Sequence, residues 1–174
     1  MDETLVHTTG QKLDYEESFR FAGYYVYKRP GVDLFIGEMR KIFDLAVWTS
    51  AGEVYAEYIT SHLFYKDELK FTWASRRCTL SRNFHTGEYD IIKNIRKIKK
   101  KGYDLKNVIM VDDTASKHRR NYGNLVLVSE FVGNPSDTEL AALTNFLKVL
   151  SSVPNVRSIE KRSWIEYSGE KSNN

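Results

Sequence analysis

The sequence contains a single cysteine, Cys78, among its 174 residues. One thiol cannot build an internal disulfide framework or a zinc site with several cysteine ligands. No stretch approaches the ~20 apolar residues of a membrane-spanning helix, and the N-terminus lacks the apolar segment of a secretory signal peptide. We therefore expect an intracellular protein, cytoplasmic or nuclear, that has no membrane partner.

An excess of charge of one sign is also missing. Lys and Arg total 26 against 23 Asp and Glu, which leaves a net charge of +3 at pH 7. Such a small excess does not by itself indicate a nucleic-acid partner. Hydrophobic residues make up 41% of the chain and charged residues 28%, which is ordinary for a globular domain. A chain of this length is expected to form one domain with its own core.

Strand-like and helix-like segments alternate along most of the chain, which is typical of an α/β layered fold with a mostly parallel sheet. Short apolar runs predict buried strands at residues 45–48, 107–111 and 125–128. Apolar residues at helical spacing predict helices at about residues 30–42, 52–63, 91–102 and 136–150.

Two of these helices have a well-defined apolar face. Pro30 opens the first, where its missing N–H does no harm, and its face is predicted to be Leu34, Phe35, Met39 and Ile42. A capping box at residues 136–139 opens the last. Its predicted face is Leu140, Leu143, Phe146, Leu147 and Leu150.

Three segments interrupt the alternation. Residues 10–27 are polar and aromatic without helical spacing, and they predict a loop or a hairpin. Residues from about 64 to 89 contain short β-type patterns at 70–74 and 77–80, which predict a small antiparallel β insertion. Residues 169–174 are polar, and we expect a disordered tail there.

Polar side chains lie at three strand ends, one of them at the start of the chain. They are Asp2, the pair Thr49 and Ser50, and the pair Asp112 and Asp113; Lys93 lies between the second and third in the sequence. In α/β folds, ligands bind at the carboxyl ends of the strands. Carboxylate oxygens suit a hard divalent cation, and a hydroxyl with an ammonium can bind phosphoryl oxygens. These residues predict a phosphoryl-transfer site, although aspartates at strand ends also begin ordinary turns.

Several ordered motifs resemble those of one enzyme family. They are MDETLVH at residues 1–7, KRPG at 28–31, VWTSA at 47–51, Lys93, and VDDT at 111–114. Together they are similar to the motifs of the FCP/SCP-like carboxy-terminal-domain phosphatases of the haloacid dehalogenase superfamily. The resemblance covers nearly the whole chain, so an FCP-homology-like phosphatase domain is expected at residues 1–168. It implies a haloacid dehalogenase-like Rossmannoid parallel sheet flanked by helices.

The resemblance also implies a mechanism and a role for each residue. In this family an aspartate attacks phosphorus and becomes a phosphoaspartate, and a second aspartate acts as general acid and base. Here Asp2 matches the acid–base residue, and Thr49, Ser50 and Lys93 match the residues that bind the phosphoryl group. Mg²⁺ is expected to be held by Asp113, supported by Asp112, and by the main-chain carbonyl of Asp2. If Lys93 lies elsewhere, Lys97 or Arg96 is the alternative.

The sequence departs from the family at its first motif. The family nucleophile lies two residues before Asp2, and Met1 occupies the position between them. We therefore expect a chain truncated within this motif, inactive as given, and without most of the central first strand. The α-ammonium of Met1 is also expected to repel a cation at the site.

Three functions stay open. The favoured one is a Mg²⁺-dependent phosphatase that acts on phosphoserine or phosphothreonine in proteins. The alternative is a catalytically inactive module that binds phosphoproteins as a scaffold. A weaker alternative is a basic nucleic-acid-binding module, based on the lysine-rich run at 97–101, although such a run is usually a solvated helix face. The sequence does not indicate an oligomeric state.

The remaining reactive residue types have simple structural interpretations. Cys78 is expected to be packed, and the basic segment 117–120 is expected to be solvated. The four histidines, His7, His62, His85 and His118, show no metal-ligand spacing. Trp48 is expected in the core, and Phe71, Trp73 and Phe84 are expected either in the core of the insertion, which is favoured, or in the lining of a substrate pocket.

Overall fold

The computed structural model describes residues 1–82 and 87–169. Its strands are β1 (Val6–Thr9), β2 (Phe19–Phe21), β3 (Tyr24–Lys28), β4 (Val47–Trp48), β5 (Thr72–Trp73), β6 (Thr79–Arg82), β7 (Tyr89–Ile92), β8 (Met110–Asp112) and β9 (Leu125–Leu127). Its α-helices are α1 (Val32–Met39), α2 (Glu53–Leu63), α3 (Arg96–Lys99), α4 (Glu139–Ser151) and α5 (Trp164–Gly169). Single 3-10 turns are η1 (Ser75–Arg77), η2 (Leu105–Asn107), η3 (Ala115–His118), η4 (Tyr122–Asn124) and η5 (Val156–Ser158). Across these two ranges, every helix is too short or too polar to cross a bilayer.

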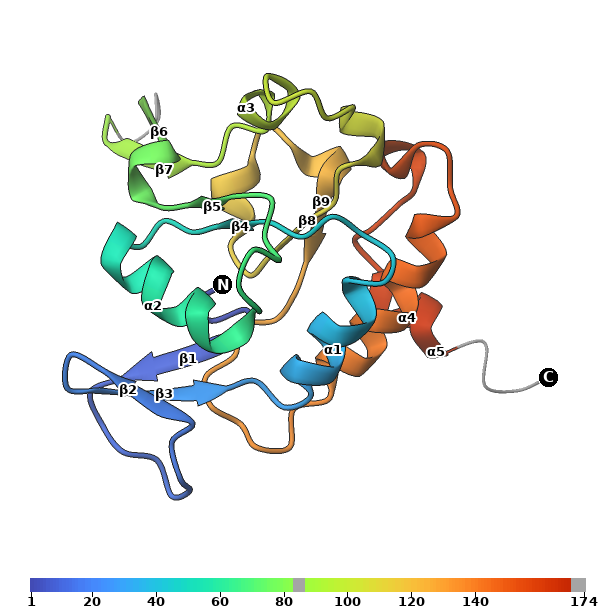
Figure 1. Cartoon of the computed structure of the whole chain (residues 1–174). Helices are drawn as coiled ribbons and strands as arrows, with labels where there is room; N and C mark the ends of the chain where they lie inside the picture. The colour runs from blue at the N-terminus through green and yellow to red at the C-terminus, as the bar shows by residue number, and fades with distance from the viewer. Residues whose placement is uncertain (83–86, 170–174) are drawn as a thin grey trace.

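The strands form four small sheets (Figure 1). Two of them are parallel pairs, β4 with β5 and β8 with β9. The other two are antiparallel: a three-stranded sheet in the order β1-β3-β2 and the pair β6 with β7. Parallel pairs, flanking helices and a small antiparallel pair give the mixed α/β fold that the sequence predicted.

The segment at 10–27 is a hairpin, one of the two conformations expected. β2 and β3 pair antiparallel, with Phe19 opposite Val26. Tyr58 on α2 donates a hydrogen bond of 2.8 Å to the carbonyl oxygen of Arg20, which attaches the hairpin to that helix.

The first helix buries a different face from the one predicted. The buried residues of α1 are Val32, Phe35, Ile36 and Met39, whereas Leu34 is 73% exposed. The buried set follows the i, i+3, i+4, i+7 spacing of a helix that begins at Val32, and Leu34 lies outside that stripe. The predicted face therefore included a residue from the wrong side of the helix.

The last long helix buries all five residues of its predicted face. Its capping differs, because the Ser136 hydroxyl does not cap the helix. The main-chain N–H of Glu139 instead donates to the Asp137 carboxylate at 3.0 Å. The carboxylate satisfies one of the free donors at the helix start, and the Glu139 side chain accepts the N–H of Ser129.

The antiparallel insertion is shorter than the sequence indicated. β5, expected within it, pairs in parallel with β4 instead, so the antiparallel part is limited to β6 and β7. Ile91 lies in β7, and the helix predicted from this residue is reduced to the single turn of α3. Phe84, which the sequence predicted to lie in the core, falls outside the described residues. In the predicted tail, Gly169 belongs to α5 and residues 170–174 also lie outside the described ranges.

The core has two parts. The larger one packs α1, α2 and α4 around Val6, Val26 and Val126. The smaller one contains Trp48 and Trp73, whose rings meet edge to face at 4.9 Å between centroids. Figure 1 shows the N-terminus inside the outline of the molecule, near the two parallel pairs, and Met1 is only 8% exposed.

Candidate active site

The first residues form a tight turn in the interior. The carbonyl oxygen of Met1 accepts hydrogen bonds from the main-chain N–H groups of Thr4, Leu5 and Val6 at 2.8 to 3.3 Å. Glu3 adopts a left-handed conformation with φ 56° to close this turn. The turn fixes the directions of the side chains of Asp2 and Thr4, which point to opposite flanks of the site.

On one flank, Asp2 contacts α2. The Tyr55 hydroxyl donates to Oδ1 of Asp2 at 2.7 Å, and the Thr8 hydroxyl donates to the Tyr55 oxygen at 2.6 Å. Burial raises the pKa of Tyr55, and its hydrogen bond to Asp2 raises it further. Tyr55 therefore stays a hydrogen-bond donor at physiological pH and holds the Asp2 carboxylate in one orientation.

On the other flank, Thr4 contacts the end of β8. Its hydroxyl donates to Oδ1 of Asp113 at 2.6 Å and lies 3.4 Å from the carbonyl oxygen of Asp2. The α-amino group of Met1 donates to the same hydroxyl at 3.2 Å. One atom thus touches three groups of the site, so the Asp113 carboxylate and the Asp2 carbonyl converge.

Lys93 and Asp112 form a buried ion pair beside this point. The Lys93 ammonium donates to Oδ2 of Asp112, and Nε2 of His118 lies 2.9 Å from the same oxygen. The side-chain amide of Asn121 donates to the carbonyl oxygen of Lys93. Burial alone would raise the pKa of Asp112, but the hydrogen bond from His118 and the charge of Lys93 outweigh it and hold that pKa far below its usual range.

We expect the substitution Asp112→Asn to lower the free energy of unfolding by about 3 kcal/mol at pH 7, because it leaves the Lys93 ammonium buried without a counter-charge. The folded pKa of Asp112 lies below its unfolded value, so its stabilising effect is present above about pH 4 and is lost as the pH falls further. The difference in the free energy of unfolding between the variant and the parent should therefore become smaller in acid. Urea unfolding at pH 7 and at pH 3 measures this, and an unchanged difference at both pH values would contradict it.

The α-amino group of Met1 is less charged than the sequence suggested. Burial lowers its pKa to about 6, and the positive charge of Lys93 contributes in the same direction. At pH 7 most of the amine is neutral, so the expected repulsion of a cation by this group is weaker than its sequence position suggested.

Thr49 and Ser50 directly follow β4. Thr49 is 4% exposed, its N–H donates to Trp73, and its hydroxyl accepts the N–H of Ala51. Ser50 is half-buried. Within residues 1–82 and 87–169, no hydrogen bond or ion pair joins either residue to Lys93 or Asp113.

The alternative cation Lys97 lies away from the carboxylates. Its ammonium donates to the carbonyl oxygens of Arg77 and Cys78, and Arg96 lies beside it on the same turn of α3. The structure therefore places Lys93, rather than Lys97, against the acidic pair.

The donor chemistry fits a magnesium ion. Oδ1 of Asp113 and the main-chain oxygen of Asp2 both lie against the Thr4 hydroxyl, and Mg²⁺ prefers oxygen ligands. Asp112 already contacts Lys93 and His118. It would therefore support a bound magnesium ion rather than bind the ion directly. In the described ranges, no group of three His, Cys, Asp or Glu side chains forms a cluster of metal-binding geometry. The Asp113 carboxylate and the Asp2 carbonyl are the two protein groups that would hold the ion.

Sequence reasoning missed four residues that build the site: Thr4, Tyr55, His118 and Asn121. His118 was expected to be solvated with its basic neighbours, but it is fully buried because η3 turns it back onto Asp112. His7 packs edge-on against Phe131 and contacts Glu3. The only available signal for Tyr55 was its position six residues after Thr49, about one turn into the predicted helix.

Comparison with known proteins identifies the family. A family model described as NLI interacting factor-like phosphatase matches residues 1–157. The chain belongs to this family. The family assignment agrees with the FCP/SCP-like resemblance seen in the sequence motifs.

Two curated relatives of this NLI interacting factor-like phosphatase domain match most of the chain. The human "Carboxy-terminal domain RNA polymerase II polypeptide A small phosphatase 1" is 31% identical over 169 residues, which are 91% of this chain and 60% of the relative. "Nuclear envelope morphology protein 1" of Saccharomyces cerevisiae is 26% identical over 176 residues, which are 91% of this chain and 40% of that protein. The chain thus spans about half the length of these relatives.

A solved structure shares the fold of the NLI interacting factor-like domain. It is the fission yeast RNA polymerase II CTD phosphatase Fcp1 bound to beryllium fluoride, with a TM-score of 0.54 and 16% identity, covering 86% of this chain and 49% of that one. Because the sequence identity is low, this similarity supports only the fold. The fold is the haloacid dehalogenase-like α/β fold expected from the motifs.

Proposed function

We propose that this chain is the phosphatase domain of a Mg²⁺-dependent protein phosphatase that hydrolyses phosphoserine or phosphothreonine. The observation that carries the proposal is the convergence of Asp2, Thr4 and Asp113 next to the Lys93–Asp112 pair. The names of the human and fission yeast relatives, which refer to the carboxy-terminal domain of RNA polymerase II, support a phosphoprotein substrate. An intracellular location, cytoplasmic or nuclear, is part of this proposal.

Each residue has a chemical task in this proposal. Asp2, held by Tyr55, gives a proton to the leaving hydroxyl and later takes one from the attacking water. Lys93, Thr49 and Ser50 bind phosphoryl oxygens and offset the negative charge that develops on them. Asp113 and the Asp2 carbonyl would hold Mg²⁺, with Asp112 in support, and the bound ion would supply further positive charge for the phosphoryl oxygens.

The nucleophile of the proposed reaction is an aspartate directly before Met1, a position that precedes the 174 residues given. The α-amino group of Met1 is buried within electrostatic range of Lys93, Asp112 and Asp113. A carboxylate attached there would therefore lie near Lys93, which is proposed to bind the phosphoryl group, and near Asp113, which is proposed to hold Mg²⁺. Binding of a phosphoprotein without hydrolysis is the second candidate function, because Thr49 and Lys93 could bind a phosphoryl group without the nucleophile.

The test of the proposal is hydrolysis of a phosphoserine peptide by the chain extended with that aspartate, with and without Mg²⁺. The additional substitution Asp2→Asn should reduce the rate by at least about 100-fold, because the leaving group loses its proton donor. If Asp2→Asn leaves the rate unchanged, the assignment of Asp2 as the acid–base residue is wrong.

A second variant tests how Asp2 is positioned. In the extended chain, Tyr55→Phe should lower kcat by about fivefold, because it removes one hydrogen bond worth about 1 kcal/mol, and should leave KM nearly unchanged. The matched control is Tyr58→Phe on the same helix, whose hydroxyl contacts the hairpin instead of the site. Equal effects of the two substitutions on kcat would contradict a positioning role for Tyr55.

A further inference from the structure

The hairpin of β6 and β7 turns its apolar side chains outward. Leu80 is 70% exposed, Tyr89 is 68% exposed and Ile91 is 43% exposed. Leu80 lies opposite Ile91 on the neighbouring strand, and Arg82, which is also exposed, lies opposite Tyr89. Partners across an antiparallel pair share one face of the sheet. These four side chains therefore form a single exposed surface, which we call the hairpin face.

The opposite face of the hairpin packs inward and is held mainly by polar contacts. Arg119 donates to the carboxylate of Asp90 and, at 3.3 Å, to the carbonyl oxygen of Ser81. Ile92 is also buried on this side. An antiparallel sheet usually packs its apolar face on the core and exposes its polar face. The reversed arrangement here leaves adjacent apolar side chains in solvent, which indicates an interaction surface.

Both strands of the hairpin begin or end at the candidate active site. β7 ends one residue before Lys93. β6 begins one residue after Cys78, whose thiol lies 3.7 Å from the carbonyl oxygen of Thr49. Residues two apart along a strand point to the same face, so the rows that start at Lys93 and Cys78 continue into the hairpin face. The hairpin face therefore extends outward from the residues proposed to bind the phosphoryl group.

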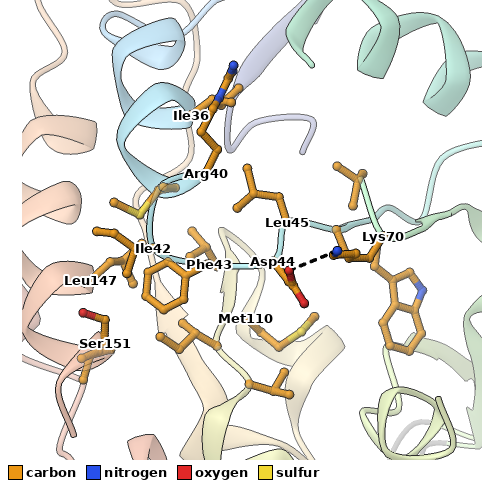
Figure 2. A pocket seen from close by; sticks show the side chains of 18 of the residues that line it. Ile36, Arg40, Ile42, Phe43, Asp44, Leu45, Lys70, Met110, Leu147 and Ser151 are labelled. Atoms are coloured by element: carbon orange, nitrogen blue, oxygen red, sulfur yellow. Dashed lines mark ion pairs between the residues drawn. The ribbon is translucent and has the colours of Figure 1, made fainter. Parts of the chain in front are cut away.

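The largest pocket of the described chain is separate from the hairpin face. Figure 2 shows this pocket, of about 860 Å³, with Phe43, Leu45 and Met110 among its lining residues. The strand that would end in the proposed nucleophile is expected to fill it, so it does not offer room for a substrate. None of the described residues of β6 and β7 lines this pocket, and the hairpin face stays accessible when the pocket is filled.

We propose that the hairpin face binds the substrate polypeptide on one side of its phosphorylated residue. It would select an apolar side chain two residues from the phosphorylated residue and an acidic side chain four residues from it. This inference rests on the proposed phosphatase function and adds a substrate preference to it.

The spacing follows from the geometry of extended chains. A strand and an extended peptide both rise about 3.3 Å per residue. With the phosphoryl group at Lys93, the second residue along the peptide would lie over the pair Leu80 and Ile91, which is apolar. The fourth residue would lie over the pair Arg82 and Tyr89. The Arg82 guanidinium is the one charge on the hairpin face, and it favours a carboxylate at that position.

The experiment compares two fluorescein-labelled phosphopeptides that bind to the full chain, by fluorescence polarisation. The first is Glu-Ala-Leu-Ala-pSer-Ala-Leu-Ala-Glu, which presents the expected spacing on both sides of the phosphoserine. The matched control is Leu-Ala-Glu-Ala-pSer-Ala-Glu-Ala-Leu, which has the same composition and charge with the two positions exchanged. The first peptide should bind about tenfold more tightly, because only it places leucine on the apolar pair and glutamate on the guanidinium.

A reversal of charge tests the outer position. Arg82→Glu should bind Lys-Ala-Leu-Ala-pSer-Ala-Leu-Ala-Lys more tightly than the first peptide, whereas the parent should show the opposite order. The control is Lys148→Glu, which makes the same change in net charge on α4, on the other side of the molecule from the hairpin (Figure 1). It should keep the order of the parent.

A loss of apolar surface tests the inner position. Leu80→Ser should weaken binding of the first peptide by about fivefold. The control is Leu34→Ser on α1, which is 73% exposed and lies outside the hairpin face, and which should leave binding unchanged. Both leucines are exposed, so both variants should melt close to the parent.

The inference is overturned if the two peptides bind equally, if neither binds at millimolar concentration, or if Leu80→Ser and Leu34→Ser act alike. It is also overturned if the parent forms a dimer that Leu80→Ser dissociates, because a second copy would then cover the hairpin face. Hydrolysis by the extended chain tests the proposed function separately. Equal binding of the two peptides would therefore remove the substrate preference without removing the phosphatase assignment.

Discussion

An aspartate placed directly before Met1, at the end of a short apolar strand, is expected to raise Mg²⁺-dependent hydrolysis of an aryl phosphate by about 1,000-fold or more. Loss of a covalent nucleophile typically costs an enzyme several orders of magnitude in kcat, and restoring it should recover a comparable factor. The added carboxylate would lie within electrostatic range of Lys93, where the Met1 amine lies now. The measurement is release of the aryl alcohol by the chain as given and by the extended chain.

The matched control is the same extension ending in asparagine. It should fill the space between β4 and β8 equally well, so both extended chains should melt well above the chain as given. Only the aspartate version should gain activity. Strong hydrolysis by the chain as given, or equal rates for the two extensions, would mean that another nucleophile operates.

Removal of the Arg29 side chain is expected to cause the largest loss of stability outside the site. Arg29 is 1% exposed and donates to the carboxylates of Asp137 and Glu139 at 2.6 to 3.0 Å. It also donates to the carbonyl oxygens of Thr4 and Ser129. The substitution Arg29→Met should lower the free energy of unfolding by about 3–5 kcal/mol, because it leaves partly buried carboxylates and carbonyls without a donor.

Urea unfolding at pH 7 measures this loss. The control is Lys148→Met, which removes an ion pair with Glu38 at the protein surface and should change stability little, because solvent screens exposed pairs. Arg29→Lys should fall between the two, since an ammonium cannot donate in the planar fork that serves both carboxylates. If Arg29→Met is no more destabilising than Lys148→Met, the Arg29 cluster does not stabilise the fold as described.

Local patterns predicted some elements well and others poorly, for physical reasons. The face of α4 follows from its sequence because the same helical spacing of apolar residues continues through all thirteen residues of the helix. The predicted helix from Ile91 to Gly102 fails because Ile91 and Ile92 pair with β6, and such pairing across the chain overrides helical spacing. The sequence places β5 in the antiparallel insertion, whereas the structure pairs it in parallel with β4. Local patterns do not indicate the direction in which two separate strands pair, because that direction depends on the whole fold.

The same distinction holds for the candidate site. The residue types and their order, from Asp2 to Asp113, could be read from the motifs alone. The hydrogen bonds that hold these residues in place could not be predicted from the motifs. Thr4 and Asp113 are 109 positions apart in the sequence, and Arg29 joins groups that no local pattern connects. His118 illustrates the limit most clearly, since a basic stretch of sequence gives no sign that one member turns inward.

The buried α-amino group of Met1 can be used to detect opening of the turn formed by the first residues. An amine that is mostly neutral at pH 7 is chemically reactive, but burial against Thr4 shields this one from reagents in solution. An amine-selective acylating label can modify it only when the first turn detaches from Asp113 and the end of β8. The rate of labelling at Met1 therefore measures how often this turn opens, and a ligand that closes the site should slow it while surface lysines continue to react.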